Sequence, residues 1–120
     1  MAEKQILVVD DHPDTLDVLS RLLRSLGFAV RNASTMQEAI EAATGAQVDL
    51  LISDLTLPDG NGAELARRIC NDRGIPAIAL SGYGPGEEGN PSDHAEFKAW
   101  LVKPIDFQLL QETIRKLLPG

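Results

Sequence analysis

Short apolar runs alternate along this chain with segments in which apolar residues return at helical spacing. Each run is followed directly by a polar residue, and each is too short to form a helix of ordinary length. Runs of this kind are typical of strands buried in a parallel sheet. We predict strands at Gln5–Val9, Phe28–Val30, Asp49–Ser53, Ala77–Leu80 and Trp100–Val102.

The segments between these runs each carry one apolar face, which predicts amphipathic helices. The second of them opens on a capping box, formed either by Ser34 with Gln37 or by Thr35 with Glu38. A turn at Pro58–Gly60 precedes the third. The first three expected helices run from Pro13 to Gly27, from the capping box to Gly45, and over Asn61–Cys70. A last helix follows Asp106, which is expected to be its N-cap residue.

The segment after Ser81 breaks this alternation, because glycine and proline crowd residues 82–91. Each glycine costs a helix about 1 kcal/mol relative to alanine, and each proline about 3 kcal/mol. We therefore expect a long loop here, with a fourth helix that is short or irregular near Ser92–Phe97.

Alternating strands and helices predict an α/β fold with helices on both faces of a sheet. Right-handed crossovers leave few topologies, and a doubly wound, five-stranded parallel sheet of order 2-1-3-4-5 fits best. We expect residues 1–120 to form one domain.

Polar side chains stand where four of the predicted strands end. Asp10 and Asp11 follow the first strand, Asp54 the third, Ser81 the fourth and Lys103 the fifth. The carboxyl ends of parallel strands share one edge of the sheet, so these groups should converge on one crevice.

Three carboxylates at adjacent strand ends would repel one another, and a hard divalent cation such as Mg²⁺ relieves that repulsion. An alternative for Asp10 or Asp11 is that one of them only caps the helix that begins at Pro13. That alternative does not account for Asp54, which precedes an apolar Leu55 and a turn.

A carboxylate beside a metal, an ammonium and a hydroxyl can also accept a phosphoryl group. In this hypothesis Asp54 is the nucleophile, Lys103 neutralises a phosphoryl oxygen and Ser81 donates a hydrogen bond to another. The alternative for Lys103 is a salt bridge to Asp54 and nothing more.

The net charge of −7 argues against nonspecific binding to nucleic acid. The single Cys70 forms no internal disulfide, which fits a reducing cytoplasm. We also expect no membrane segment and no signal peptide, since neither pattern occurs in the sequence.

Four pieces in order make the chain similar to the receiver domains of two-component response regulators. They are Val8–Asp11, Asp54–Gly62, Leu80–Tyr83 and Val102–Pro104. The resemblance implies a flavodoxin-like fold and a domain that is no enzyme in its own right. It further implies a phosphoryl group taken from a phosphohistidine, carried by a sensor histidine kinase or a histidine phosphotransfer protein.

The resemblance also implies a role for each matched residue. Asp54 matches the phosphorylated aspartate, and Asp10 and Asp11 match the pair that holds Mg²⁺ or Mn²⁺. The remaining matches are Thr56 as a metal ligand through its backbone carbonyl, Ser81 and Trp100 as switch residues, Lys103 beside the phosphate, and Pro104 in a cis peptide bond after Lys103. A downstream partner would bind the face made by the fourth helix, fifth strand and fifth helix.

Several alternatives stay open at this stage. Trp100 could be an ordinary core aromatic, and His12 and His94 are expected to be solvent-facing. A haloacid dehalogenase type of phosphohydrolase would need a second aspartate two residues after its nucleophile, and His12 and Thr56 occupy those positions here. A receiver-like module that binds partners without phosphorylation is the third class. The domain could stand alone or belong to a hybrid sensor kinase.

Overall fold

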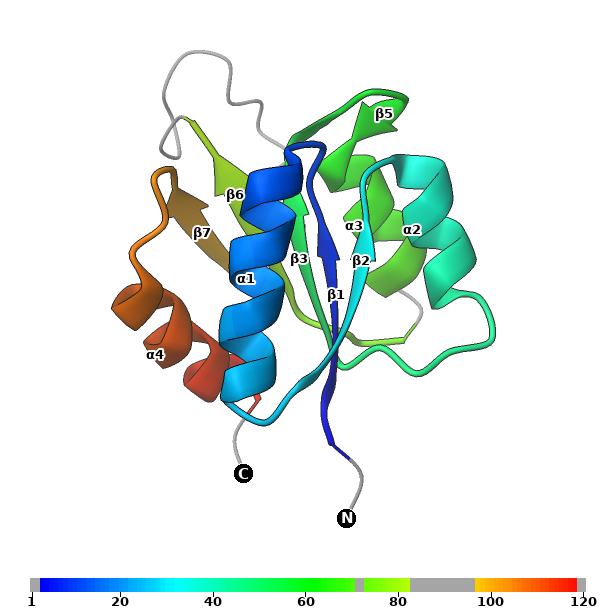
Figure 1. Cartoon of the computed structure of the whole chain (residues 1–120). Helices are drawn as coiled ribbons and strands as arrows, with labels where there is room; N and C mark the ends of the chain where they lie inside the picture. The colour runs from blue at the N-terminus through cyan, green and yellow to red at the C-terminus, as the bar shows by residue number, and fades with distance from the viewer. Residues whose placement is uncertain (1–2, 71–72, 83–96, 119–120) are drawn as a thin grey trace.

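The computed structural model describes residues 3–70, 73–82 and 97–118. Its main sheet has five parallel strands, in the order β2-β1-β3-β6-β7, with arrows that point the same way in Figure 1. The strands are β1 (Gln5–Val9), β2 (Ala29–Ala33), β3 (Leu50–Asp54), β6 (Ala77–Ser81) and β7 (Ala99–Val102). The predicted order 2-1-3-4-5 is confirmed.

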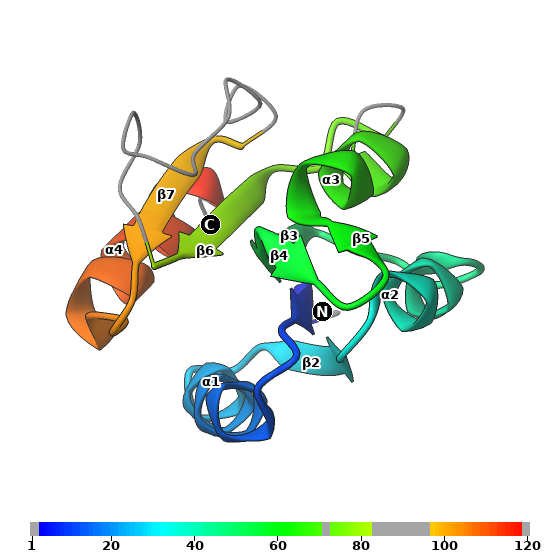
Figure 2. The same ribbon diagram turned by 90° about the horizontal axis from the view of Figure 1, so that it is seen from above.

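Helices cover both faces of this sheet, as Figure 2 shows from above the strand ends. Helices α1 (Pro13–Ser25) and α4 (Phe107–Leu117) pack on one face, and α2 (Met36–Ala43) and α3 (Gly62–Cys70) on the other. Successive residues of a strand point to opposite faces. Ile6 and Val8 of β1 therefore join the core under α1 and α4, while Leu7 and Val9 join the core under α2 and α3.

The starts of α2 and α4 are fixed by capping residues that the sequence predicts. The Thr35 hydroxyl oxygen accepts a hydrogen bond from the backbone N–H of Glu38, which makes Thr35 the N-cap of α2. The Glu38 carboxylate in turn accepts from the Ser34 backbone N–H at 2.9 Å. The Asp106 carboxylate accepts from the N–H groups of Gln108 and Leu109 at the start of α4. These bonds satisfy donors that have no partner inside their own helix.

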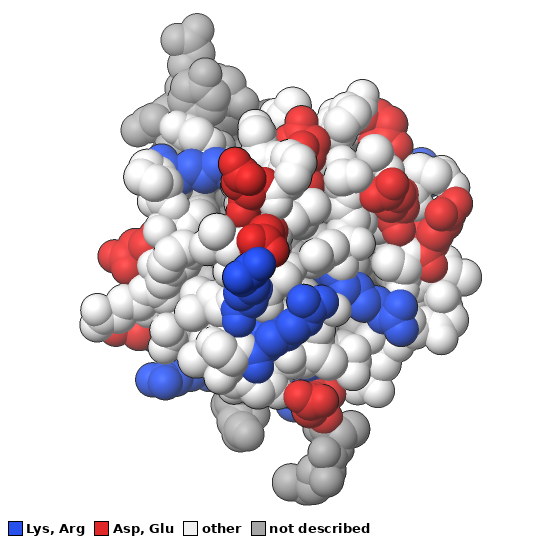
Figure 3. All heavy atoms as spheres, in the orientation of Figure 1, with Lys and Arg blue, Asp and Glu red and all other residues white. Residues whose placement is uncertain are grey.

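Helix α1 begins at a proline and carries charges that suit its dipole. Asp14 lies in its first turn and Arg24 in its last. In Figure 3, acidic atoms are concentrated in the upper half of this face of the molecule, beside a basic patch at the upper left, and a basic band crosses the middle of the face. Negative charge at a helix N-terminus and positive charge at its C-terminus both stabilise the helix.

Two regions of the fold differ from the prediction. Strand β2 runs to Ala33 rather than ending at Val30, and its added residues Arg31 and Asn32 are exposed. Because β2 is an edge strand, it tolerates polar side chains that an apolar pattern misses. A two-stranded hairpin, β4 (Thr56–Leu57) and β5 (Gly60–Asn61), closes around the predicted turn. Strands of two residues leave no apolar run to detect.

The predicted irregular fourth helix lies outside the described residues, except that Phe97 at its end is buried. In the parts of the chain that the structure describes, every helix is too short or too polar to cross a membrane.

Candidate functional site

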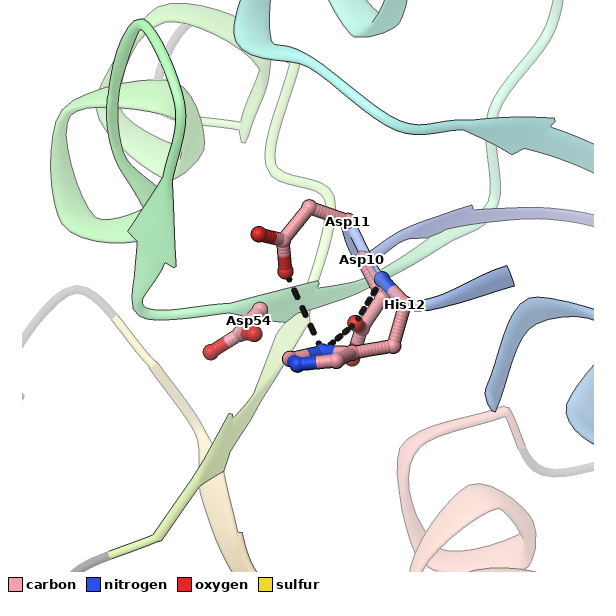
Figure 4. A group of neighbouring side chains, drawn as sticks. All are labelled: Asp10, Asp11, His12 and Asp54. Atoms are coloured by element: carbon pink, nitrogen blue, oxygen red, sulfur yellow. Dashed lines mark hydrogen bonds and ion pairs between the residues drawn. The ribbon is translucent and has the colours of Figure 1, made fainter. Parts of the chain in front are cut away.

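Three carboxylates meet at the carboxyl edge of the sheet. Asp10 follows β1 and Asp54 ends β3, and the pairing of Val9 with Ser53 sets them side by side. The N–H of Asp10 donates to the Ala33 carbonyl at 3.1 Å, which continues the ladder by one residue. Ligand atoms from Asp10, Asp11, His12 and Asp54 all lie within 4.8 Å of one another (Figure 4).

The three carboxylates differ in their access to solvent. The Asp10 side chain is fully buried, with 0% exposed, whereas 39% of the Asp11 side chain is exposed. Asp54 is intermediate, with 11% of its side chain exposed. Solvent therefore contacts the side chains of Asp11 and Asp54, but not that of Asp10.

The Lys103 ammonium lies between two of these carboxylates. Its Nζ donates to Oδ2 of Asp10 at 2.9 Å and to Oδ2 of Asp54 at 3.1 Å. Burial on its own lowers the pKa of Lys103, but the hydrogen bonds and charges of Asp10 and Asp54 outweigh it and raise the pKa above its usual value. Lys103 is thus a fixed cation that bridges both strands, rather than the partner of Asp54 alone.

His12 occupies the other side of Asp10. Oδ1 of Asp10 accepts from the His12 backbone N–H at 2.8 Å and lies 2.8 Å from the His12 Nδ1 atom. The hydrogen bond with Asp10, and then the charges of Asp10 and Asp11, raise the pKa of His12. His12, not an aspartate, is the N-cap residue of α1, and its side chain makes no capping hydrogen bond.

The imidazole is a feature that the sequence analysis missed. The expectation that His12 faces solvent is correct as far as exposure goes, since 64% of its side chain is exposed. Its Nδ1 atom nevertheless also lies 3.1 Å from Oδ1 of Asp11. The available signal was its position directly after the acidic pair.

The connection from β3 to α3 packs against Asp54 and hydrogen-bonds to its carboxylate. The Gly62 N–H donates to the Leu55 carbonyl at 2.8 Å, and the Thr56 N–H donates to Oδ1 of Asp54 at 3.3 Å. A Cβ on Gly62 would collide with the Asp54 carbonyl oxygen. Glycine at this position lets the start of α3 lie directly against the strand end.

Ser81 and Lys103 are tied together through their backbones. Ser81 ends β6, is 4% exposed, and pairs in register with Val102. The Lys103 N–H donates to the Ser81 carbonyl at 2.7 Å. The peptide bond between Lys103 and Pro104 is cis. This pairing brings the ends of β6 and β7 to the same edge as the carboxylates.

Trp100 lies on β7, which is separated from β3 and its Asp54 by β6. It is half-buried on β7, packs against the core under α2 and α3, and makes an edge-to-face contact with Phe97, with ring centroids 6.2 Å apart. These contacts suit a core aromatic, and the switch role of Trp100 stays a prediction.

The donor set fits a hard divalent cation. Three carboxylates face one permanent cation, Lys103, and two of the three are largely withdrawn from water. Buried carboxylates in excess of their counter-charges are costly unless a metal or a proton compensates them. Oxygen ligands of this kind suit Mg²⁺ or Mn²⁺.

Comparison with known protein families shows to which family the chain belongs. The sequence model of the response regulator receiver domain matches residues 6–115. The chain belongs to this family. The receiver domain serves two-component signal transduction, and the resemblance and the doubly wound α/β fold predicted from the sequence are both confirmed.

Individual relatives agree with this assignment. An uncharacterized 14.6 kDa protein of Leptolyngbya boryana is 36% identical over 88% of this chain and 83% of its own length. The response regulator protein PilR of Pseudomonas aeruginosa is 29% identical over 98% of this chain, which spans 27% of PilR. A crystal structure of the response regulator TrrA from Thermotoga maritima, in complex with Mg²⁺ and BeF, superposes with a TM-score of 0.85 and 29% identity, covering 96% of this chain and 99% of TrrA.

Proposed function

We propose that this receiver domain accepts a phosphoryl group onto Asp54 from a phosphohistidine. The donor would be a sensor histidine kinase or a histidine phosphotransfer protein. The observation that carries the proposal is the position of Asp54 among the three carboxylates. Of the described acidic residues, Asp54 combines a hydrogen bond to Lys103 with a side chain that solvent reaches. Asp10 also bonds to Lys103, but its side chain is closed to solvent. Asp11 is exposed to solvent, but it pairs with His12 rather than with Lys103.

The transfer exchanges one bond to phosphorus for another. The P–N bond to the donor imidazole breaks while a P–O bond to the Asp54 carboxylate forms, and the donor nitrogen keeps the electron pair. A carboxylate is a nucleophile in its ionised form, so the transfer needs no base to activate it. Catalysis then consists mainly of positioning and of stabilising negative charge.

Asp10, Asp11, Asp54 and the Thr56 backbone carbonyl are the groups that we propose to hold Mg²⁺ or Mn²⁺. When bound, the cation supplies positive charge beside the transferred group. Lys103 supplies a second positive charge, already fixed 3.1 Å from Asp54. The Thr56 N–H, which donates to Oδ1 of Asp54, holds the carboxylate in place.

We propose that the switch consists of Ser81 and Trp100, as in the family. Ser81 ends the strand beside β3, and its carbonyl is bonded to the Lys103 N–H. A move of the Ser81 hydroxyl toward a phosphoryl group would therefore also shift the end of β7, through the bond between the Ser81 carbonyl and the Lys103 N–H. The downstream partner would bind β7, α4 and the segment before β7. Exposed Val102, Phe107 and Leu109 supply apolar surface there.

The test is a phosphorylation assay with acetyl phosphate and Mg²⁺, read by intact mass. The wild type should gain one phosphoryl group, Asp54→Asn should gain none, and EDTA should prevent the gain. Asp59→Asn, which changes an exposed aspartate of the adjacent hairpin, should be phosphorylated like the wild type. A wild type that gains no phosphate would indicate a binding module, and repeated turnover of an aryl phosphate would indicate a phosphohydrolase.

A further inference from the structure

The acidic site contains a nitrogen atom that the carboxylate chemistry does not use. Figure 4 shows the His12 ring folded back against Asp10 and Asp11, with Asp54 alongside. Its Nδ1 atom lies 2.8 Å from Oδ1 of Asp10 and 3.1 Å from Oδ1 of Asp11. The ring therefore shares one small volume with all three carboxylates.

These separations are those of neighbouring ligands on one metal ion. In an octahedral site with bonds of about 2.1 Å, adjacent ligand atoms lie about 3.0 Å apart. The same spacing suits a hydrogen bond, in which a proton on Nδ1 is shared with the carboxylates. A cation that accepts imidazole can replace that proton without a large movement of the three side chains.

Among the described residues, the His12 side chain bonds only to Asp10 and Asp11. Its side chain makes no capping hydrogen bond to α1, although the residue stands at the N-cap. With 64% of the side chain exposed, the ring can also adjust its tilt without repacking the core.

We infer that His12 is a metal ligand of this receiver domain and shifts its cation preference from Mg²⁺ toward divalent transition ions such as Co²⁺ and Zn²⁺. The inference rests on the proposed function for the presence of a cation site. Mg²⁺ favours oxygen ligands, whereas imidazole is a good ligand for zinc and other transition metals. His12 is thus a specificity residue for the ion, beside the carboxylates that bind either kind.

The first test is calorimetric titration of the metal-free full chain with Mg²⁺ and with Co²⁺ at about pH 8, above the ordinary pKa of histidine. His12→Ala should weaken Co²⁺ binding about tenfold or more and leave Mg²⁺ binding nearly unchanged. Asp17→Ala, which alters an exposed residue further along α1, should change neither affinity. The ratio of the two dissociation constants is the decisive quantity, because a general loss of charge or fold affects both ions.

The second test reads the ring itself. Long-range ¹H–¹⁵N correlation spectra of the imidazoles, recorded with and without Zn²⁺, should show a shift of the Nδ1 resonance that is absent from His12→Ala. The variant also separates the signals of His12 from those of His94.

An unchanged ratio of dissociation constants in His12→Ala, or an Nδ1 resonance that does not respond to Zn²⁺, would overturn the inference. If the wild type still binds Mg²⁺ and gains one phosphoryl group on Asp54, the proposed function stands without it. If His12-dependent Co²⁺ binding is found but no phosphate is gained with either ion, the inference stands and the proposed function fails.

Discussion

Gly62 lies directly against the backbone of Asp54, where a side chain on Gly62 would meet the Asp54 carbonyl oxygen and approach the Ser53 hydroxyl. The contact joins the first residue of α3 to the last residue of β3. It fixes the backbone that carries the proposed acceptor carboxylate, whereas Lys103 contacts the carboxylate itself.

Gly62→Ala should therefore destabilise the fold. The added methyl group meets rigid backbone rather than a flexible side chain, so we expect a loss of about 1–3 kcal/mol in the free energy of unfolding. Urea titration followed by the fluorescence of the single Trp100 measures it.

Gly82 provides the matched control. Among the described residues, no heavy atom lies within 4 Å of a Cβ at this position, and the backbone does not adopt the left-handed conformation that strains an alanine. Gly82→Ala should be neutral or slightly stabilising, because it restricts the unfolded chain. Equal losses in the two variants would contradict the role given to Gly62.

The sequence was sufficient for the sheet and for the set of residues at its edge. Apolar runs such as Ile6–Val9 predict buried strands, and the rule that parallel strand ends share an edge then brings Asp10, Asp54 and Lys103 together. Both steps depend on patterns within a few residues and on topology, which a single sequence carries.

The contacts within the site could not be predicted in the same way. Lys103 bonds to residues 93 and 49 positions away, and which oxygen it reaches depends on side-chain geometry. The inward turn of the His12 ring is equally invisible in the sequence, since an exposed residue at a helix start usually points outward. Local pattern identifies the groups at an edge, whereas tertiary geometry decides how they pair.

Asp59 makes the stability of the domain depend on pH. Hydrogen bonds from the backbone N–H groups of Met36 at 2.7 Å and Gln37 at 3.0 Å tie the hairpin to the start of α2 and lower the pKa of Asp59. A folded-state pKa below the unfolded one stabilises the fold above the unfolded pKa, and that stability is lost as the pH falls through the folded pKa.

Comparison of the wild type with Asp59→Asn isolates this effect, because the amide retains one acceptor oxygen but cannot ionise. The wild type should unfold at a higher temperature than Asp59→Asn near about pH 7, and the gap should close toward about pH 3. Thermal unfolding at a series of pH values measures the gap. A difference in unfolding temperature that stays constant across the pH series would mean that the variant loses a hydrogen bond or a packing contact rather than the charge of Asp59.

The Cys70 thiol should be unreactive in the folded protein. It is 5% exposed, and burial raises its pKa to about 11. The thiolate is the reactive form, and at about pH 8 only about one thiol in a thousand would be ionised. Iodoacetamide should label the native protein very slowly and the urea-unfolded protein at the rate of a free cysteine, as read by intact mass. Fast labelling without urea would show that α3 opens at its end.

Asp11 couples the stability of the domain to its cation. It lies in the cluster with Asp10 and Asp54 but pairs with His12 rather than with Lys103, so at a pH where His12 is neutral its charge is mainly repelled. Asp11→Asn should raise the unfolding free energy in EDTA, by up to about 1 kcal/mol because the group is partly exposed. Millimolar Mg²⁺ should make the wild type the more stable of the two, since only the wild type keeps the full ligand set and gains stability by binding.

Glu112→Gln removes the same charge from the exposed side of α4 and should leave the stabilisation by Mg²⁺ intact. An Asp11→Asn variant that gains as much from Mg²⁺ as the wild type would remove Asp11 from the metal site.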